Sequence, residues 1–246
     1  TSTTCGWAEF AVNLLLFSDA DRQSSHRVAV HDRRLQHLLQ VHCAQAGDTL
    51  RVGEINGLVG EARILQIDDK AAVLDVMLDQ PPPPKLPLTL ILALPRPKML
   101  RRILRNVAEL GVGELHLIHS YRVEKSYWLS PVLEEASVRE YLLQGLEQSR
   151  DTRLPAVHYH RRFKPFVEDS LPGLLTGRTA LLAQPGEHPP CPRHISGPCL
   201  LVIGPEGGFI PYEVEKLHDS GCQPVSLGAR ILRVENAVTS SLGRLF

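Results

Sequence analysis

Apolar and polar residues alternate in two different ways on either side of four consecutive prolines, Pro81 to Pro84. Before the prolines, the apolar runs are short and are separated by turn residues. Asn56-Gly57 lies between two such runs, and this dipeptide is a strong signal for a tight hairpin turn. The pattern predicts a small β-barrel with one short helix over 32–41. Its strands are expected at 14–17, 27–30, 49–52, 58–65 and 71–78.

After the prolines, apolar strands alternate with helical segments. This alternation predicts an α/β domain, with a parallel sheet that carries helices on both faces. Strands are expected at 88–94, 114–118, 156–159, 179–183, 200–203 and 224–227, and helices at 98–110, 131–150, 163–171, 211–220 and 235–245. Because four prolines cannot continue a helix or a central strand, we place a boundary there. The predicted domains are residues 13–80 and 86–246.

Composition narrows the possibilities without indicating a function. Lys plus Arg and Asp plus Glu both number 27, so any nucleic-acid site must be a local patch. The five cysteines form no C-x-x-C pair, so we expect free thiols and no metal site. No apolar run approaches the roughly 20 residues that span a bilayer, and the first residues lack the basic-then-apolar order of a signal peptide. We therefore expect a cytoplasmic protein without membrane contact.

A glycine-rich loop follows the predicted strand at 200–203, in the sequence LLVIGPEGGF over 200–209. Glycines allow a ligand to approach the backbone closely, and Pro211 suits the first position of the next helix. The spacing matches neither the dinucleotide fingerprint nor a P-loop. The loop therefore indicates either a small-molecule site or a tight strand-to-helix turn in which Glu206 bonds backbone amides.

Two further segments carry charge. The loop before the last helix contains Arg230, Arg233 and Glu235, and forked guanidinium donors suit phosphate or carboxylate. The segment 95–105 has five basic residues and no acidic one, a composition that suits phosphate contacts. Each feature is equally compatible with a solvated surface, which is the usual location of such charges.

Together these segments resemble the ribosomal RNA small subunit methyltransferase E family, of the SPOUT class. The resemblance rests on GPEGG at 204–208 and LGxRILRxExA at 227–237. It is supported by AELGV at 108–112, EQSxxxR at 147–153, GDxL at 47–50 and Asn56-Gly57, and it covers the chain from about Asn13 to the end. Two positions depart from the family. Asn236 replaces the usual Thr, and Ile210 replaces a frequent Ser, which removes a helix cap.

The resemblance implies a PUA-like N-terminal barrel that binds RNA, and a SPOUT-type parallel sheet with a deep trefoil knot. It implies a homodimer that uses S-adenosylmethionine to methylate N3 of a uridine in 16S rRNA, within the assembled 30S subunit, without a metal. One alternative is a non-catalytic RNA-binding protein that retains the knotted fold. Another is a doubly wound nucleotide-binding enzyme unrelated to RNA.

The resemblance also suggests roles for individual residues. Arg233 and Arg230 are candidates for stabilising an anion on the base or for contacting RNA phosphate. Glu235 is the first candidate base, and Glu206 is a second with a more structural role. RNA contacts are expected from Arg96, Lys98, Arg122, Gln148 and Arg153. Cofactor contacts are expected from Leu182, Ala183, Gln184, Ile203, Gly204, Pro205, Glu206, Gly207, Gly208, Leu227, Gly228, Ile231, Leu232 and Asn236.

Overall fold

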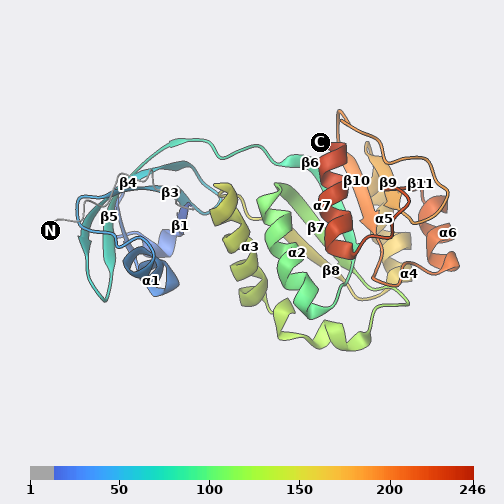
Figure 1. Ribbon diagram of the computed structural model, residues 1–246, viewed down its shortest axis with the longest axis horizontal. Coiled ribbons are helices and arrows are strands. Elements are labelled where there is room, and N and C mark those ends of the chain that lie inside the picture. Colours follow the sequence, from blue (N-terminus) through green and yellow to red (C-terminus); the bar gives the residue numbers. More distant parts are fainter. Residues whose placement is uncertain (1–13) are drawn as a thin grey trace. The chain divides into compact units, whose positions relative to one another are not determined.

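The computed structural model describes residues 14–246 (Figure 1). The chain divides into two compact units. The first comprises the described part of Thr1–Pro83 together with Leu146–Arg153, and the second comprises Pro84–Gly145 and Leu154–Phe246. Each unit has its own sheet. Asn13, where the first predicted domain begins, lies outside the described residues.

The first unit contains a five-stranded sheet in the order β1-β3-β4-β5-β2. Its strands are β1 (Leu15–Phe17), β2 (Arg27–Val30), β3 (Thr49–Glu54), β4 (Val59–Ile67) and β5 (Ala72–Gln80). β1 and β3 are parallel, and the other pairs are antiparallel. The predicted hairpin between β3 and β4 is confirmed, because Asn56 adopts the positive φ of 63° that its turn requires.

The core of this unit lies between its sheet and helix α1 (Asp32–Gln40). Strand alternation directs Phe17, Val28 and Leu74 inward, and all three side chains are completely buried. Leu35 and Leu38 of α1 join the same cluster, in agreement with the predicted apolar face of this helix. A short 3-10 turn, η1 (Asp19–Asp21), connects β1 to β2.

The first unit also includes the end of helix α3 (Glu135–Ser149) and the turn after it. The Leu14 amide donates to the Glu147 carbonyl at 2.8 Å, and the Arg33 guanidinium forms two hydrogen bonds to the Glu147 carboxylate, at 2.8 and 3.1 Å. The Thr152 hydroxyl donates to the Gly57 carbonyl at 2.6 Å. Residues far along the chain therefore complete the fold of this unit.

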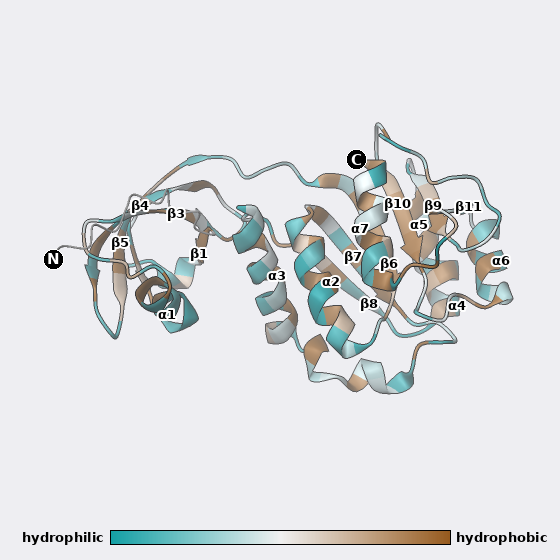
Figure 2. Cartoon of the chain, viewed as in Figure 1, coloured by the Kyte–Doolittle hydropathy of each residue, from teal (hydrophilic) through white to brown (hydrophobic). Residues whose placement is uncertain are grey.

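The second unit contains a six-stranded sheet in the order β11-β9-β10-β6-β7-β8. Every pair of neighbouring strands is parallel, so the predicted parallel sheet is confirmed. All five residues of β10 are buried, and Figure 2 shows β9 and β10 as hydrophobic along most of their length. The strands are β6 (Leu86–Ala93), β7 (Val112–Ile118), β8 (Ala156–His160), β9 (Thr179–Ala183), β10 (Cys199–Ile203) and β11 (Gln223–Val225).

Helices lie on both faces of this sheet, as predicted. The outer strand β8 shows this, because Val157 and Tyr159 line a groove with residues of α3, whereas His160 on the other face packs against the Phe166 ring at 4.6 Å. The remaining helices are α2 (Pro97–Glu109), α4 (Phe163–Pro165), the π-helix η4 (Phe166–Ser170), α5 (Leu171–Leu175), α6 (Pro211–Asp219) and α7 (Val234–Leu245).

Two predicted helices differ in the structure. The helix expected over 131–150 begins only at Glu135, after the 3-10 turns η2 (Lys125–Leu129) and η3 (Pro131–Leu133), because the Glu134 backbone is extended with a ψ of 137°. The helix expected over 163–171 is divided into α4, η4 and α5. Among residues 14–246, no helix is long and apolar enough to cross a membrane.

Helix α2 packs closely against α3 within the second unit. It buries Leu100, Ile103, Leu104 and Val107 at helical spacing, and Gly111 follows its C-terminal end with a φ of 78°, which favours glycine. The Arg105 side chain donates to Gln144 Oε1 at 2.7 Å. Gly145 lies so close to α2 that a Cβ atom there would collide with the Arg105 carbonyl oxygen.

We predict that Gly145→Ala lowers the free energy of unfolding by about 1–3 kcal/mol, because the added methyl group must push α2 and α3 apart. Gly243→Ala is the matched control, since Gly243 also lies in a helix but has open space around its Cβ position. It should stabilise the protein by up to about 1 kcal/mol through helix propensity. Urea unfolding of both variants measures the difference, and equal effects would contradict the packing analysis.

Candidate functional site

The glycine-rich loop follows β10 and leads directly into α6. It runs from Gly204 to Ile210 and is closed by a hydrogen bond from the Gly208 amide to the Pro205 carbonyl at 2.8 Å. Gly208 has a φ of 73°, a backbone conformation that residues other than glycine rarely adopt. A Cβ atom at Gly204 would lie 3.0 Å from the Phe209 ring. A side chain would therefore strain the backbone at Gly208 and would have to displace the Phe209 ring at Gly204.

The buried carboxylate of Glu213 anchors this loop. One oxygen accepts the Ile210 amide at 3.1 Å, and the other accepts the Tyr121 amide at 2.7 Å. Only 3% of Glu213 is exposed. A carboxylate at the third helical position commonly caps the first amide in this way. Glu213 therefore satisfies the amide of Ile210 and ties the loop to the segment after β7, although no side chain at position 210 caps the helix.

Two arginines that were predicted to bind RNA contact the same loop. Arg96, which precedes α2, forms an ion pair with Glu206, and Arg122 donates a hydrogen bond to the Gly207 carbonyl. The hydrogen bond to Glu206 raises the pKa of Arg96, so this guanidinium stays charged. Because the Arg96 side chain is 65% exposed, it remains accessible from outside while it holds Glu206.

The second loop, residues 226–233, connects β11 to α7. Gly228 has a φ of 122°, and the Leu227 carbonyl accepts a hydrogen bond from Arg244 Nη2 at 2.9 Å. The segment after β9 runs beside this loop, because the Ser226 amide donates to Pro189 and the Ser226 carbonyl accepts the Cys191 amide, both at 2.8 Å. Three separate segments thus meet at the carboxyl ends of β9, β10 and β11, where parallel sheets usually bind ligands.

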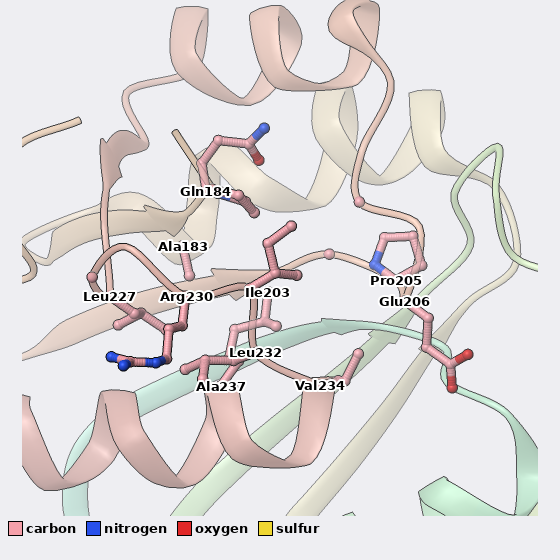
Figure 3. A pocket seen from close by; sticks show the side chains of 15 residues that line it. Ala183, Gln184, Ile203, Pro205, Glu206, Leu227, Arg230, Leu232, Val234 and Ala237 are labelled. Carbon is pink, nitrogen blue, oxygen red and sulfur yellow. The ribbon is translucent and has the colours of Figure 1, made fainter. Parts of the chain in front are cut away.

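These segments enclose a mostly apolar cavity of about 90 Å³. Figure 3 shows Val234 and Ala237 on α7 at one side, Ala183 and Gln184 at the other, and Leu232 with Ile203 between them. Val234, Ala237 and Pro185 were not predicted as cavity residues, although Val234 and Ala237 have the helical spacing that could have identified them. The predicted residues that line the cavity are Ala183, Gln184, Ile203, Gly204, Pro205, Glu206, Gly208, Leu227, Gly228, Arg230, Ile231 and Leu232.

Three predicted cofactor residues do not line this cavity. Leu182 is completely buried in β9, Gly207 bonds Arg122, and Asn236 lies exposed on α7. Successive residues of a helix are turned by about 100°, so α7 directs Val234 and Ala237 inward and Asn236 outward. The departure of Asn236 from the family pattern therefore falls outside the cavity wall.

A second cavity of about 600 Å³ adjoins the first and shares Glu206, Ile231 and Leu232 with it. Four cationic side chains line it, and so does Glu235, whose Oε2 atom is buried without a hydrogen-bond partner among the described residues. Arg233 and Glu235, two of the predicted catalytic residues, therefore lie here, whereas Arg230 lies in the first cavity. The four cations are Arg96, Lys98, Arg102 and Arg233.

The two other residues that were predicted to bind RNA belong to the first unit. Gln148 is exposed near the end of α3. Arg153 donates hydrogen bonds to the carbonyl groups of Pro82 and Pro83, so its guanidinium is partly occupied by the proline segment.

Comparison with known proteins identifies the family. A family model described as an RNA methyltransferase domain matches residues 82–245. The ribosomal RNA small subunit methyltransferase E of Treponema pallidum (strain Nichols) is 30% identical over 244 residues, which cover 94% of this chain and 89% of that protein. The chain belongs to the ribosomal RNA small subunit methyltransferase E family. The resemblance found in the sequence is thereby confirmed.

Further members of the family agree with this assignment. The enzyme of the same name from Synechocystis sp. (strain ATCC 27184 / PCC 6803 / Kazusa) is 30% identical over 233 residues, covering 89% of this chain and 72% of that protein. A crystal structure of the methyltransferase E of Neisseria gonorrhoeae, bound to S-adenosyl methionine, superposes with a TM-score of 0.75 at 22% identity. It covers 93% of this chain and 95% of that chain, so the two proteins share the fold.

We predict that Glu213→Ala destabilises the protein by about 1–3 kcal/mol, because the amides of Ile210 and Tyr121 lose their acceptor. Glu215→Ala is the matched control, because Glu215 is two residues further along α6 and is exposed. It should change stability by less than about 0.5 kcal/mol. Thermal unfolding of the two variants tests this prediction. If Glu213→Ala unfolds at the same temperature as the control, the carboxylate does not anchor the loop.

Proposed function

We propose that this chain transfers a methyl group from S-adenosylmethionine to N3 of a uridine in the 16S rRNA of the small ribosomal subunit. The observation that carries the proposal is the pair of adjoining cavities, one apolar and one basic, that share Ile231 and Leu232. A methyl donor in the first cavity and an RNA base in the second would meet across these two residues. Membership of the RNA methyltransferase family supports the same pairing.

The residues of the first cavity suit S-adenosylmethionine. Its wall consists largely of apolar side chains and of loop backbone, which can hold an adenine ring by packing and by peptide hydrogen bonds. Gly204, Gly208 and Gly228 leave the backbone open to close approach. Glu206 and Arg230 are the charged side chains of the wall, and they suit a ligand that carries both an ammonium and a carboxylate group.

Residues of the second cavity would prepare the base. When bound, S-adenosylmethionine supplies a methyl group that is activated by its positive sulfur. Uracil N3 carries a proton at neutral pH, and a base must accept it before or during transfer. We assign this role to Glu235, whose buried Oε2 lacks a partner that the N3–H group would provide. Arg233 would donate to a uracil oxygen and stabilise the negative charge that develops there.

RNA would be held mainly through its phosphates. Lys98, Arg102 and Arg233 place positive charge in the second cavity, and Arg96 adds to it while it retains its pair with Glu206. We further propose that residues 13–80 form the PUA-like RNA-binding domain and residues 86–246 the SPOUT domain. The reaction would take place in the cytoplasm, on the assembled 30S subunit.

The trefoil knot and the homodimer are part of the same proposal. Support for the knot comes from the segment after β9, which bonds both the loop before α7 and the end of α7. The Ile195 amide donates to the Leu245 carbonyl at 2.8 Å, and the Cys191 amide donates to Ser226. In a trefoil knot the C-terminal part of the chain passes through a loop formed by an earlier segment. Such a passage would bring the segment after β9 into contact with the loop before α7 and with the end of α7.

The first test is methylation of 30S subunits that lack the modification, followed by mass mapping of the methylated nucleoside. We expect 3-methyluridine at one position of 16S rRNA. Cofactor binding without any methylation would favour the alternative, a non-catalytic RNA-binding protein. Methylation of another atom would leave the donor site intact and overturn the assignment of N3.

We predict that Arg233→Ala lowers the rate of methyl transfer by about 100-fold or more, because the developing charge on the base loses its donor. The affinity for S-adenosylmethionine, measured by calorimetry, should stay unchanged, since Arg233 does not line the first cavity. Arg101→Ala is the matched control, because Arg101 is exposed on α2 and lines neither cavity. Equal turnover of the two variants would remove Arg233 from the mechanism.

We predict that Asn236→Thr, which restores the family residue, changes the affinity for S-adenosylmethionine by less than about twofold, as expected for an exposed position. A calorimetric titration of the variant beside the unaltered protein measures this. A much larger gain in affinity would mean that α7 turns position 236 toward the cofactor when it binds.

A further inference from the structure

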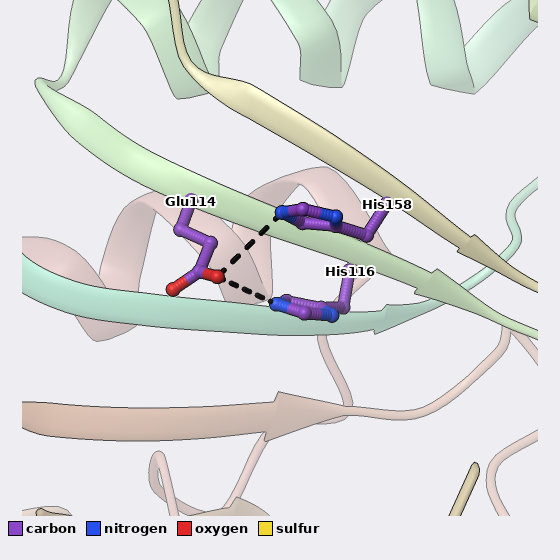
Figure 4. Close-up of side chains that lie close together, drawn as sticks. All are labelled: Glu114, His116 and His158. Atoms are coloured by element: carbon purple, nitrogen blue, oxygen red, sulfur yellow. Dashed lines mark ion pairs between the residues drawn. The ribbon is translucent and has the colours of Figure 1, made fainter. Parts of the chain in front are cut away.

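A cluster of imidazole and carboxylate groups lies on β7 and β8, at the opposite edge of the second unit's sheet from β11. Glu114 and His116 are two residues apart on β7, so they share one face of the sheet, and His158 is the register partner of His116 on β8. Figure 4 shows the Glu114 carboxylate pointing toward both rings. The proposed methyl-transfer chemistry does not use these residues.

The distances in this cluster match the coordination shell of a metal ion. Glu114 Oε1 lies 3.1 Å from His116 Nε2 and 3.6 Å from His158 Nε2. Ligand atoms of all three residues lie within 4.8 Å of one another. Around a tetrahedral zinc ion with bonds of about 2.05 Å, ligand atoms are about 3.3 Å apart. The two distances measured from Glu114 lie on either side of this value.

His116 supplies a second, independent observation. The side chain is only 6% exposed, and its Nε2 atom is buried without a hydrogen bond of acceptable geometry. An imidazole binds a metal ion as the neutral ring. A neutral ring has one N–H group and one lone pair.

The neighbouring groups allow a tautomer in which that lone pair points into the cluster. His116 Nδ1 lies 2.9 Å from His160 Nε2, and Thr89 donates to Glu114 Oε2 at 2.9 Å. With the proton on Nδ1 and donated to His160, the His116 Nε2 lone pair faces the Glu114 carboxylate. Two acceptors at 3.1 Å repel each other unless a cation lies between them. Ligands that are held by such outer hydrogen bonds are typical of metal sites.

We propose that Glu114, His116 and His158 form a binding site for a divalent transition-metal ion, with zinc as the ion that their chemistry suits best. Two imidazole nitrogens and one carboxylate oxygen are a recurrent zinc ligand set, in which water completes the shell. The His158 side chain is 46% exposed and that of Glu114 is 31% exposed, so an ion and its water can enter from solvent. Bound there, the ion would fasten the outer strand β8 to β7.

Zinc titration of the full chain against a competing chromogenic chelator tests the proposal. We expect binding of one ion, a rise in the unfolding temperature with zinc but not with magnesium, and an affinity loss on the order of 100-fold or more in His158→Ala. Glu114→Gln should weaken binding in the same way. His218→Ala is the matched control, because His218 is 56% exposed on α6, remote in sequence from the cluster.

Two results would overturn the site. One is a zinc affinity of the unaltered protein that equals that of His158→Ala. The other is a sulfur shell in the X-ray absorption spectrum of the zinc-loaded protein, since that would assign the ion to cysteines. Both readouts are independent of methyl transfer, so they remain decisive whether or not the proposed function holds.

Discussion

The parallel pairing of β9, β10 and β6 determines where the parts of the candidate site lie. Ala183 and Ile203 are register partners at the ends of β9 and β10, so the segments that follow them start side by side. These strands are buried, and their amides and carbonyls can be satisfied only by neighbouring strands. A shift in register would disrupt that ladder and the packing of the apolar side chains on both faces of the sheet. The loops are therefore placed by the sheet more than by their own sequences.

Local pattern predicted most elements because each depends on nearby residues. Apolar runs identified the strands, and the glycine and proline positions identified the loop after β10. The division of 163–175 into α4, η4 and α5 could not be predicted, because apolar periodicity does not distinguish a π-helical turn from the α-helix around it. The order of the strands in the sheet could not be predicted either, because periodicity does not indicate which strands become neighbours.

The parts of the site that escaped prediction depend on contacts between distant residues. Glu213 looked like an ordinary first-turn acid, but one of its partners is the Tyr121 amide, 92 positions earlier. The cluster of Glu114 with two histidines escaped for the same reason, because its members lie on adjacent strands and lack the close pairing of a zinc finger. Conversely, Leu182 and Asn236 were expected to contact the cofactor, yet the strand and the helix turn them away from the cavity.

The positively charged side chains of the site have two uses. Arg96 and Arg122 hold the glycine-rich loop through Glu206 and the Gly207 carbonyl, whereas Lys98, Arg102 and Arg233 have no such contact with this loop. An arginine that anchors a loop is already oriented, so it loses less conformational freedom when a phosphate arrives. The structural role of Arg96 is thus compatible with a role in recognition.

Helix α3 begins in one compact unit and ends in the other, and this continuity bears on how the protein can be divided. The prolines at 81–84 suggest a natural place to cut, but a fragment that stops there lacks Glu147 and Thr152, which bond Arg33 and Gly57. A fragment that starts after the prolines would keep those groups without their partners. The two units are therefore not exchangeable modules: recombination with a relative must transfer residues 146–153 along with the N-terminal region.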